Sequence, residues 1–225
     1  MRHFKLLVFL CLLLSVSLGM RQYTIGPSTA ATAQFTCPFT DSFPGGAAAP
    51  LSASWTRAAG VSSTGISLQQ NGSGAIQVST LSDSAAAIAN NVSCPYLSDG
   101  QYAQATVAGT PTASGHVSLL VAYNNTTSNG YTVRFSSTSG TMYSIASGSL
   151  SSIATGCGGA TAGKVLKFTI TGTSAPYTLT AYVNGSSVCT TTSSLYAGSN
   201  GYPGVRIEDD AIALTDEELS NFSGN

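Results

Sequence analysis

The chain has 225 residues, of which only 8% are charged, and its formal net charge at pH 7 is −1. Ordinary soluble domains contain about 25% charged residues, so solubility must come mainly from hydroxyl and amide groups. Neither sign of charge is concentrated strongly enough to attract nucleic acid or an anionic membrane, and the sequence argues against both as partners.

The first 19 residues have the features of a secretion signal. Arg2 and Lys5 precede an unbroken apolar run over residues 6–14, and Ser17 and Gly19 place small residues at the spacing of a cleavage site. A membrane anchor is the alternative, but it needs about 20 apolar residues. We therefore expect a secreted, extracellular protein that has no membrane segment once the signal is removed.

The remainder of the chain is long enough for one large all-β domain. It keeps six of the eight basic residues and all nine acidic residues, a net charge of −3. Residues 20–34 are small and polar, which predicts a flexible leader or an added edge strand. Residues 35–225 are predicted to form a single β-sandwich domain.

Short apolar runs predict strands in the first part of this domain. They lie at residues 35–43, 66–70, 75–78 and 85–89 and are separated by turn sequences such as NGSG and LSDS. Alanine dominates the last run, so a short helix is the alternative there. Trp55 is predicted to be a core or edge anchor, and a ligand platform is the alternative.

Four consecutive runs between Gln101 and Ser147 carry the strongest strand signal. They read QYAQATVAG, GHVSLLVAY, GYTVRFSS and GTMYSIAS, and Gly-, Asn- and Ser-rich turns divide them. Alternation of polar and apolar residues predicts half-buried antiparallel strands, with Val133 and Phe135 facing the core. Residues 148–163 are small and are predicted to form a long loop.

The last third of the chain continues the same pattern. Residues 164–172 predict a strand that turns Leu166, Phe168 and Ile170 to one face, and residues 177–192 predict a hairpin with Asn-Gly in its turn. Two further runs, VRIEDD and SNFSG, end the chain. Short elements and short connections, without a convincing amphipathic helix, predict an antiparallel sandwich or jelly roll.

Four cysteines remain after signal removal, an even number that is typical of two disulfides in an exported chain. Three connectivities fit the sequence, and we favour Cys37–Cys94 and Cys157–Cys189. A metal site is the competing interpretation. It is disfavoured because no two of the cysteines lie within a few residues of each other, and His116 is the only histidine left to join them.

Several segments, read together, point to a known family. They are TDSF followed by Trp55, then QYAQATV, GHVSLLVAY, GYTVRFSS, GTMYSIASG, KVLKFTITG, YTLTAYVNGSSV, GYPGVRI and LSNFSG, which cover most of the chain after the signal. In these segments the chain resembles the concanavalin A-like lectin and glucanase sandwiches, particularly their laminin-G-like modules. The resemblance implies a two-sheet antiparallel β-sandwich, a jelly roll whose first strand pairs with its last. It also implies carbohydrate on a concave face and calcium at the rim.

The same sandwich serves lectins, hydrolases, lyases and adhesion modules, so activity has to be judged from residues. Glycosidases use a pair of carboxylates, and no glutamate occurs between Met20 and Ile207. The resembling glucanases carry E-x-D-x-x-E on one strand, whereas here Glu208 and Asp210 are followed by Ala213 in place of the third acid. The sequence therefore argues against this hydrolase chemistry.

Other catalytic patterns are also incomplete. A serine hydrolase needs a histidine base, and His116 is the only candidate, with no serine in a G-x-S-x-G turn. Polysaccharide lyases of the resembling fold use Arg, Gln, His and Tyr, and Arg134, Gln104, His116 and Tyr143 supply these types. A lyase is the catalytic alternative that stays open.

Acidic residues are concentrated near the C-terminus. Carboxylate oxygens that converge at about 2.3–2.6 Å bind Ca²⁺, so Glu208, Asp209 and Asp210 are candidate ligands of a structural calcium ion. The alternative is a solvated loop in which Thr215 caps a helical turn and Glu218 completes the capping box.

Acceptor sequences for N-glycosylation are frequent in this Asn-, Ser- and Thr-rich chain, and all lie in turn-like segments. They occur at Asn71, Asn91, Asn124, Asn125, Asn184 and Asn221.

Strand alternation also predicts a polar face that could bind sugar. If Val133 points to the core, Thr132 and Arg134 point outward, and Tyr102 and Gln104 can do likewise on the same sheet. Sugar binding combines aromatic rings with fixed hydrogen-bonding groups, and an ordinary polar sheet face is the alternative. The candidate ligand-binding residues are Tyr102, Gln104, Thr132, Arg134 and Tyr143.

Taken together, these features predict a secreted, non-catalytic module that binds an extracellular glycan or a surface protein in adhesion. One alternative is a structural protein of a filament or sheath, which self-associates through strand edges with few charges. The other is a polysaccharide lyase or hydrolase-like enzyme. No cofactor besides a structural calcium ion is expected.

Overall fold

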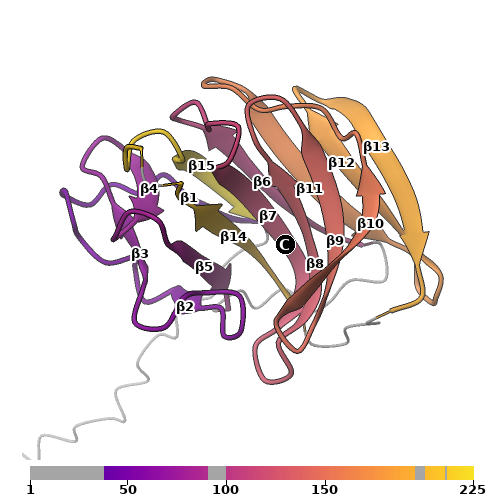
Figure 1. The fold of residues 1–225 in the computed structure, drawn as a ribbon. Helices are drawn as coiled ribbons and strands as arrows, with labels where there is room; N and C mark the ends of the chain where they lie inside the picture. Colours follow the sequence, from indigo (N-terminus) through magenta and orange to yellow (C-terminus); the bar gives the residue numbers. More distant parts are fainter. Residues whose placement is uncertain (1–37, 91–99, 196–200, 211) are drawn as a thin grey trace, which may run out of the picture. The chain divides into compact units, whose positions relative to one another are not determined.

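Figure 1 shows the computed structural model, which describes residues 38–90, 100–195, 201–210 and 212–225. Over these residues the chain forms β-strands and turns, and no helix long and apolar enough to cross a membrane occurs among them. The predicted all-β class is confirmed. The predicted signal, residues 1–19, and the predicted leader, residues 20–34, lie outside the described ranges.

The strands form two antiparallel sheets. Sheet A contains, in spatial order, β13 (Ser186–Ser193), β12 (Tyr177–Val183), β11 (Val165–Thr171), β6 (Gln101–Val107), β15 (Leu219–Gly224), β4 (Ala75–Val78) and β3 (Leu68–Gln70), and β1 (Phe39–Asp41) pairs with β15. Sheet B contains β10 (Ser149–Thr155), β9 (Gly140–Ala146), β8 (Asn129–Phe135), β7 (His116–Asn124), β14 (Tyr202–Glu208), β5 (Ser84–Ala89) and β2 (Trp55–Arg57).

The hydrophobic core lies between the two sheets and is built from the residues that alternation turns inward. Val133 and Phe135 of β8 are fully buried, and so are Leu166, Phe168 and Ile170 of β11. Burying one such side chain stabilises the fold by about 1.5–3 kcal/mol. The faces predicted for these two strands are confirmed.

Trp55 anchors one end of this core. Its ring lies 5.7 Å from the ring of Phe39, 5.8 Å from that of Phe43 and 4.8 Å from that of Phe222. The indole Nε1–H donates a hydrogen bond of 2.8 Å to Asp41 Oδ2, which satisfies the polar group of a ring that is only 7% exposed. The prediction of a core anchor is confirmed.

The pairing of the first and last strands, implied by the family resemblance, is present. Phe39 lies opposite Gly224, and Asp41 lies opposite Phe222 in the β1–β15 ladder. Residues 85–89, for which a short helix was the alternative, lie in β5.

The structure contradicts two expectations for the central region. Residues 149–155 form β10 instead of a loop, because Ser147 and Gly148 both have positive φ angles, 48° and 81°, and make a tight two-residue hairpin turn after β9. In addition, β6 and β7 follow each other in sequence but belong to different sheets, whereas the residues of β6 were expected on the same sheet as Arg134.

A disulfide connects the two sheets at one edge of the sandwich. Cys189 lies in β13, the edge strand of sheet A, and Cys157 follows β10, the edge strand of sheet B. Their Cα atoms are 4.9 Å apart. The predicted Cys157–Cys189 bond is therefore formed, whereas Cys37 and Cys94 lie outside the described residues and their pairing stays a prediction.

We expect that replacing both Cys157 and Cys189 with alanine lowers the free energy of unfolding by about 3–4 kcal/mol. The bond spans 32 residues of sequence, and its loss gives the unfolded chain more conformational freedom. Urea denaturation of both proteins without reductant measures the difference. An unchanged midpoint and slope would show that the bond adds no stability.

Candidate functional site

The outer face of sheet B is divided into an apolar half and a polar half. In the apolar half, Ala58 and Val61 from the segment after β2 pack on Ile88, Leu120 and Ile145 of the sheet. Each of these five side chains is at most 4% exposed. This part of the face is therefore covered by the chain itself.

The polar half contains five side chains from four neighbouring strands, which we call the polar cluster. Arg206 and Glu208 of β14 lie two residues apart and so share a face. In the β14–β7 ladder, Glu208 pairs with His116 and Arg206 pairs with Ser118. In the β7–β8 ladder, Ser118 pairs on its other side with Arg134. The polar cluster consists of His116, Arg134, Tyr143, Arg206 and Glu208.

Glu208 joins the two arginines of the polar cluster. Its Oε2 atom accepts from Arg134 Nη2 at 2.5 Å and from Arg206 Nη1 at 2.8 Å. Arg206 also donates from Nε to Val61 O at 3.0 Å, and its side chain is only 8% exposed. The side chains of Arg134 and Glu208 are 17% and 31% exposed, so these two groups are the ones a ligand can reach.

Arg134 connects this ion pair to the other two members. Its Nη2 atom lies 3.1 Å from His116 Nδ1, and its Cζ atom lies 5.4 Å from the centroid of the Tyr143 ring. A guanidinium can only donate hydrogen bonds, so His116 Nδ1 accepts, and the proton of the neutral imidazole is assigned to Nε2. The arginine is held between an acceptor and an aromatic face.

Burial and the two neighbouring arginines lower the pKa of His116 and so favour its neutral form. Burial lowers the pKa of His116, and the positive charge of Arg134 lowers that pKa further, while Glu208 acts in the opposite direction. Arg206 also lowers this pKa and Asp210 raises it. At acidic pH, protonation of His116 would place a third positive charge beside those of Arg134 and Arg206.

Two polar atoms at this face have no hydrogen-bond partner among the described residues. They are Arg134 Nε and Ser118 Oγ, both fully buried from solvent. A buried polar group without a partner costs about 1–3 kcal/mol. The hydrogen-bonding capacity of this face is therefore not fully used within the described chain.

The structure separates the ligand-binding residues that the sequence analysis placed on one surface. Arg134 and Tyr143 do lie together, and Thr132 shares their face but is buried and donates to Leu119 O at 3.0 Å. Tyr102 and Gln104, however, belong to β6 in sheet A. The expected common surface is wrong, because the connection between β6 and β7 passes from one sheet to the other.

Tyr102 instead belongs to the outer face of sheet A. The ammonium nitrogen of Lys167 lies 4.6 Å from the centroid of its ring, and its hydroxyl group is 2.9 Å from Ser223 Oγ. Gln104 lies opposite Lys167 in the β6–β11 ladder. These residues form a separate polar surface, on the other side of the sandwich from Arg134.

Sequence reasoning missed Arg206 and Glu208 as members of this site and considered His116 only as a catalytic base or as a partner of the cysteines in a metal site. The alternation R-x-E in VRIE does place both charges on one face of a strand. The sequence does not say, however, that β14 lies between β5 and β7 and thus beside His116.

A second concentration of charge lies just beyond β14, but its members differ from the predicted calcium ligands. Carboxylate oxygens of Asp209, Asp210 and Glu217 lie within 4.8 Å of one another. We call these three residues the acid cluster. Glu208 is not part of it, because strand alternation turns this side chain to the outer face of sheet B, where both arginines bind it.

Two of the three members of the acid cluster are buried, and Asp210 is half-buried, whereas Ile212 and Thr215 in the segment that follows are exposed. Glu217 is fully buried and Asp209 is 4% exposed. Burial, together with the nearby charges of Asp210, Asp209 and Asp216, raises the pKa of Glu217 to about 7, although a hydrogen bond from the Thr112 amide acts against this shift. Residues 214–216 form a turn, so the predicted helical turn is absent.

The predicted glycosylation sites differ in their surroundings. The side-chain nitrogen of Asn71 donates to Glu218 Oε1 at 2.8 Å, and that of Asn125 donates to Arg57 O at 3.2 Å. Asn184 and Asn221 are exposed. The side-chain oxygen of Asn124 accepts two backbone hydrogen bonds in its own turn. Asn91 lies outside the described residues. Glycosylation at all six sites stays a prediction.

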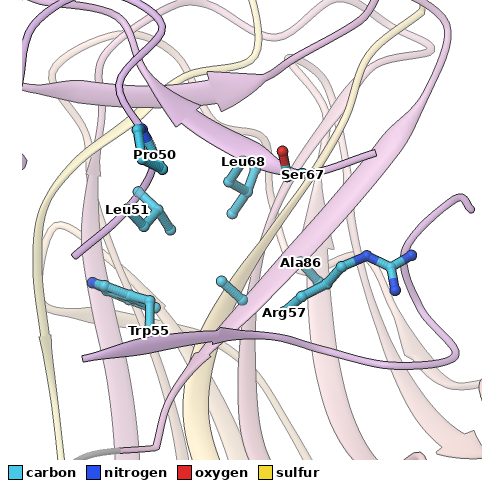
Figure 2. A pocket seen from close by; sticks show the side chains of 8 residues that line it. Pro50, Leu51, Trp55, Arg57, Ser67, Leu68 and Ala86 are labelled. Atoms are coloured by element: carbon cyan, nitrogen blue, oxygen red, sulfur yellow. The ribbon is translucent and has the colours of Figure 1, made fainter. Parts of the chain in front are cut away.

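Figure 2 shows a pocket of about 170 Å³ beside strands β2 and β3, which are edge strands of the two sheets. Leu51, Leu68 and Trp55 give it a mainly apolar lining. Arg57 also lines it, but its guanidinium donates to the carbonyl oxygens of Ser62, Ser63 and Ile66. The pocket therefore offers little polar chemistry, in contrast to the polar cluster.

No protein-family model and no curated protein matches this chain by sequence. Solved structures do match it by fold. The carbohydrate binding module CBM66 from Bacillus subtilis matches with a TM-score of 0.50 and 15% identity, over 75% of this chain and 91% of that one. The potassium-bound carbohydrate recognition domain of Emp46p matches with a TM-score of 0.52 and 12% identity, over 76% and 88%.

The carbohydrate recognition domain of Emp47p gives a similar result, a TM-score of 0.52 and 11% identity, over 78% of this chain and 89% of that one. At these identities the likeness concerns the fold. The chain has a concanavalin A-like jelly-roll fold, as the resemblance of its sequence implied.

The electrostatics of the polar cluster can be tested by NMR, because His116 is the only histidine outside the first 19 residues. We expect its pKa to lie below the ordinary value of 6.5. Replacing Arg134 with methionine removes the adjacent positive charge and should raise this pKa, whereas Lys167→Met on sheet A should leave it unchanged. Equal values in all three proteins would contradict the assigned contact.

Proposed function

We propose that this protein is a secreted carbohydrate-binding module, and that the polar cluster on the outer face of sheet B is its binding site. The observation that carries the proposal is the Arg134–Glu208 pair, which is partly exposed and is fixed from both sides by Arg206 and His116. The carbohydrate-binding modules and recognition domains that share the fold support it at the level of architecture.

The chemistry of the pair suits neighbouring hydroxyl groups of a sugar. The Glu208 carboxylate accepts hydrogen bonds from hydroxyl groups, and the Arg134 guanidinium donates to their oxygen atoms. Hydrogen bonds to charged groups are stronger than those between neutral groups. Tyr143 adds an aromatic ring beside the arginine, which gives the carbon-bonded face of a sugar ring an apolar surface.

The site is preorganised, which lowers the entropic cost of binding. Arg206 is held by Val61 O and by Glu208, and Glu208 in turn holds Arg134. A ligand would therefore meet charged groups that are already oriented. The covered apolar half of the same sheet provides a rigid border to the site.

An extracellular location follows from the same proposal. The first 19 residues have the features of a secretion signal, and a disulfide such as Cys157–Cys189 persists in oxidising compartments. The glycan or glycosylated surface partner would be met outside the cell, where a module of this kind takes part in adhesion.

The test is binding of the secreted protein to a glycan array, followed by affinity measurements on the glycans retained. Because Arg134 donates from a charged group, Arg134→Ala should weaken binding by roughly 10- to 100-fold. Tyr143→Ala should weaken it as well, through loss of the aromatic ring.

Tyr102→Ala is the matched control for Tyr143→Ala. Tyr102 also has a cation over its ring, the ammonium group of Lys167, but it lies on sheet A. The affinity of this variant should equal that of the wild type. Binding that survives Arg134→Ala and Tyr143→Ala but is lost in Tyr102→Ala would place the site on sheet A and refute the proposal.

A polysaccharide lyase is a second candidate, favoured by one specific contact. His116 Nδ1 and Arg134 Nη2 are 3.1 Å apart, and Tyr143 lies beside the same arginine. A lyase removes a proton next to the carboxylate of a uronic acid, and it needs a neutral base near a cation that holds this carboxylate. Because Nε2 carries the ring proton, His116 would act as this base through Nδ1, after the substrate carboxylate has drawn Arg134 Nη2 away from that atom. Gln104, the fourth residue considered for this chemistry, lies on sheet A and cannot take part.

The lyase candidate predicts that the protein releases unsaturated sugars from an anionic polysaccharide such as alginate or pectate. Their formation is followed by ultraviolet absorbance, and His116→Ala should abolish it. Binding of these polymers without any such product would leave the non-catalytic function as the conclusion.

A further inference from the structure

We propose that the acid cluster of Asp209, Asp210 and Glu217 binds a calcium ion. This site uses Glu217 in place of Glu208, and it does not depend on whether the polar cluster binds sugar. All three side chains provide carboxylate oxygens, the ligands that hard cations prefer.

The geometry of the acid cluster fits a single ion. Two oxygens bound to one Ca²⁺ at about 2.3–2.6 Å can be at most roughly 5 Å apart. One carboxylate oxygen from each of Asp209, Asp210 and Glu217 satisfies this limit, because these three atoms lie within 4.8 Å of one another. Calcium takes six to eight oxygen ligands, so water or backbone carbonyl groups would complete the shell.

A second observation points independently to a ligand at this place. Glu217 is fully buried, and its Oε2 atom has no hydrogen-bond partner among the described residues. The other oxygen, Oε1, accepts from Thr112 N at 3.0 Å. A carboxylate oxygen that is removed from water and left without a donor is costly, and a cation beside it would offset that cost.

Two glycines in the loop between β6 and β7 allow this loop to pack closely against Glu217 and the residues before it. A side-chain carbon at Gly115 would collide with the Glu217 carboxylate, and one at Gly109 would collide with the carbonyl oxygen of Thr215. Thr112 lies between these glycines, and its hydroxyl donates to Asp210 Oδ2. The connection from β6 to β7 therefore packs closely against the acidic segment only because glycine occupies both positions.

An ion here would join the end of β14 to the segment just before β15, and hydrogen bonds connect two segments distant in sequence to the same carboxylates. Asp209 and Asp210 directly follow β14, Glu217 precedes β15, and the amide of Ser82 donates to Asp209 Oδ1 at 3.1 Å. Thr112, in the loop that leads into β7, donates from its amide to Glu217 Oε1. Calcium binding should therefore stabilise the folded protein measurably.

The test is thermal unfolding of the metal-free secreted protein with added CaCl₂. At a calcium concentration of about 100 times Kd, we expect the midpoint to rise by roughly 5–10 °C, and calorimetric titration with CaCl₂ should give one ion per chain. Glu217→Gln keeps the shape of the side chain but removes its charge, so the rise should be lost. Asp210→Asn is a second variant with the same expected result.

Glu218→Gln is the matched control, because this neighbouring carboxylate accepts from Asn71 instead of joining the acid cluster. It should keep the full calcium response. Absence of a rise in the wild type, or an equal rise in Glu217→Gln and Asp210→Asn, would overturn the proposal. An equal rise with MgCl₂ would overturn the assignment to calcium, since Mg²⁺ requires shorter, octahedral contacts.

Discussion

The ion pairs of Glu208 hold together the face on which the proposed site lies. Strand β14 lies between β5 and β7, with Val205 and Ile207 in the core and Arg206 and Glu208 on the outside. Because Glu208 binds both Arg206 and Arg134, it links two strands that are not neighbours in sheet B. Partly buried ion pairs often contribute little net stability, so the main effect of this network is to fix the orientation of the side chains that it joins.

The scarcity of charge makes the position of each charged group informative. Only 8% of residues are charged, and the C-terminal acids divide into two different environments. Glu208 faces two guanidinium groups, while Asp209, its neighbour in sequence, joins Asp210 and Glu217 in a cluster of which two members are buried. The division follows from geometry, because β14 ends at Glu208 and the chain after it no longer alternates between the two faces of sheet B.

The two outer faces of the sandwich differ in what they offer a ligand. On sheet B, the segment after β2 covers the apolar half and leaves a bordered, charged surface with two unpartnered polar atoms among the described residues. On sheet A, the Lys167–Tyr102 contact lies on a separate surface. The apolar pocket near Leu51 is lined by core residues at an open sheet edge. The charged surface therefore combines access, fixed donors and acceptors, and an aromatic ring in one place.

The sequence alone determined the features that depend on local alternation and turn chemistry. These are the all-β class, the strands carrying Val133 and Phe168, their inward faces, and the burial of Trp55. Tertiary structure alone decided which strands are neighbours. Period-two alternation assigns a residue to a face but not to a sheet, so it could not separate Tyr102 from Arg134. Nor could it bring Glu208 to His116, because these contacts join strands far apart in the chain.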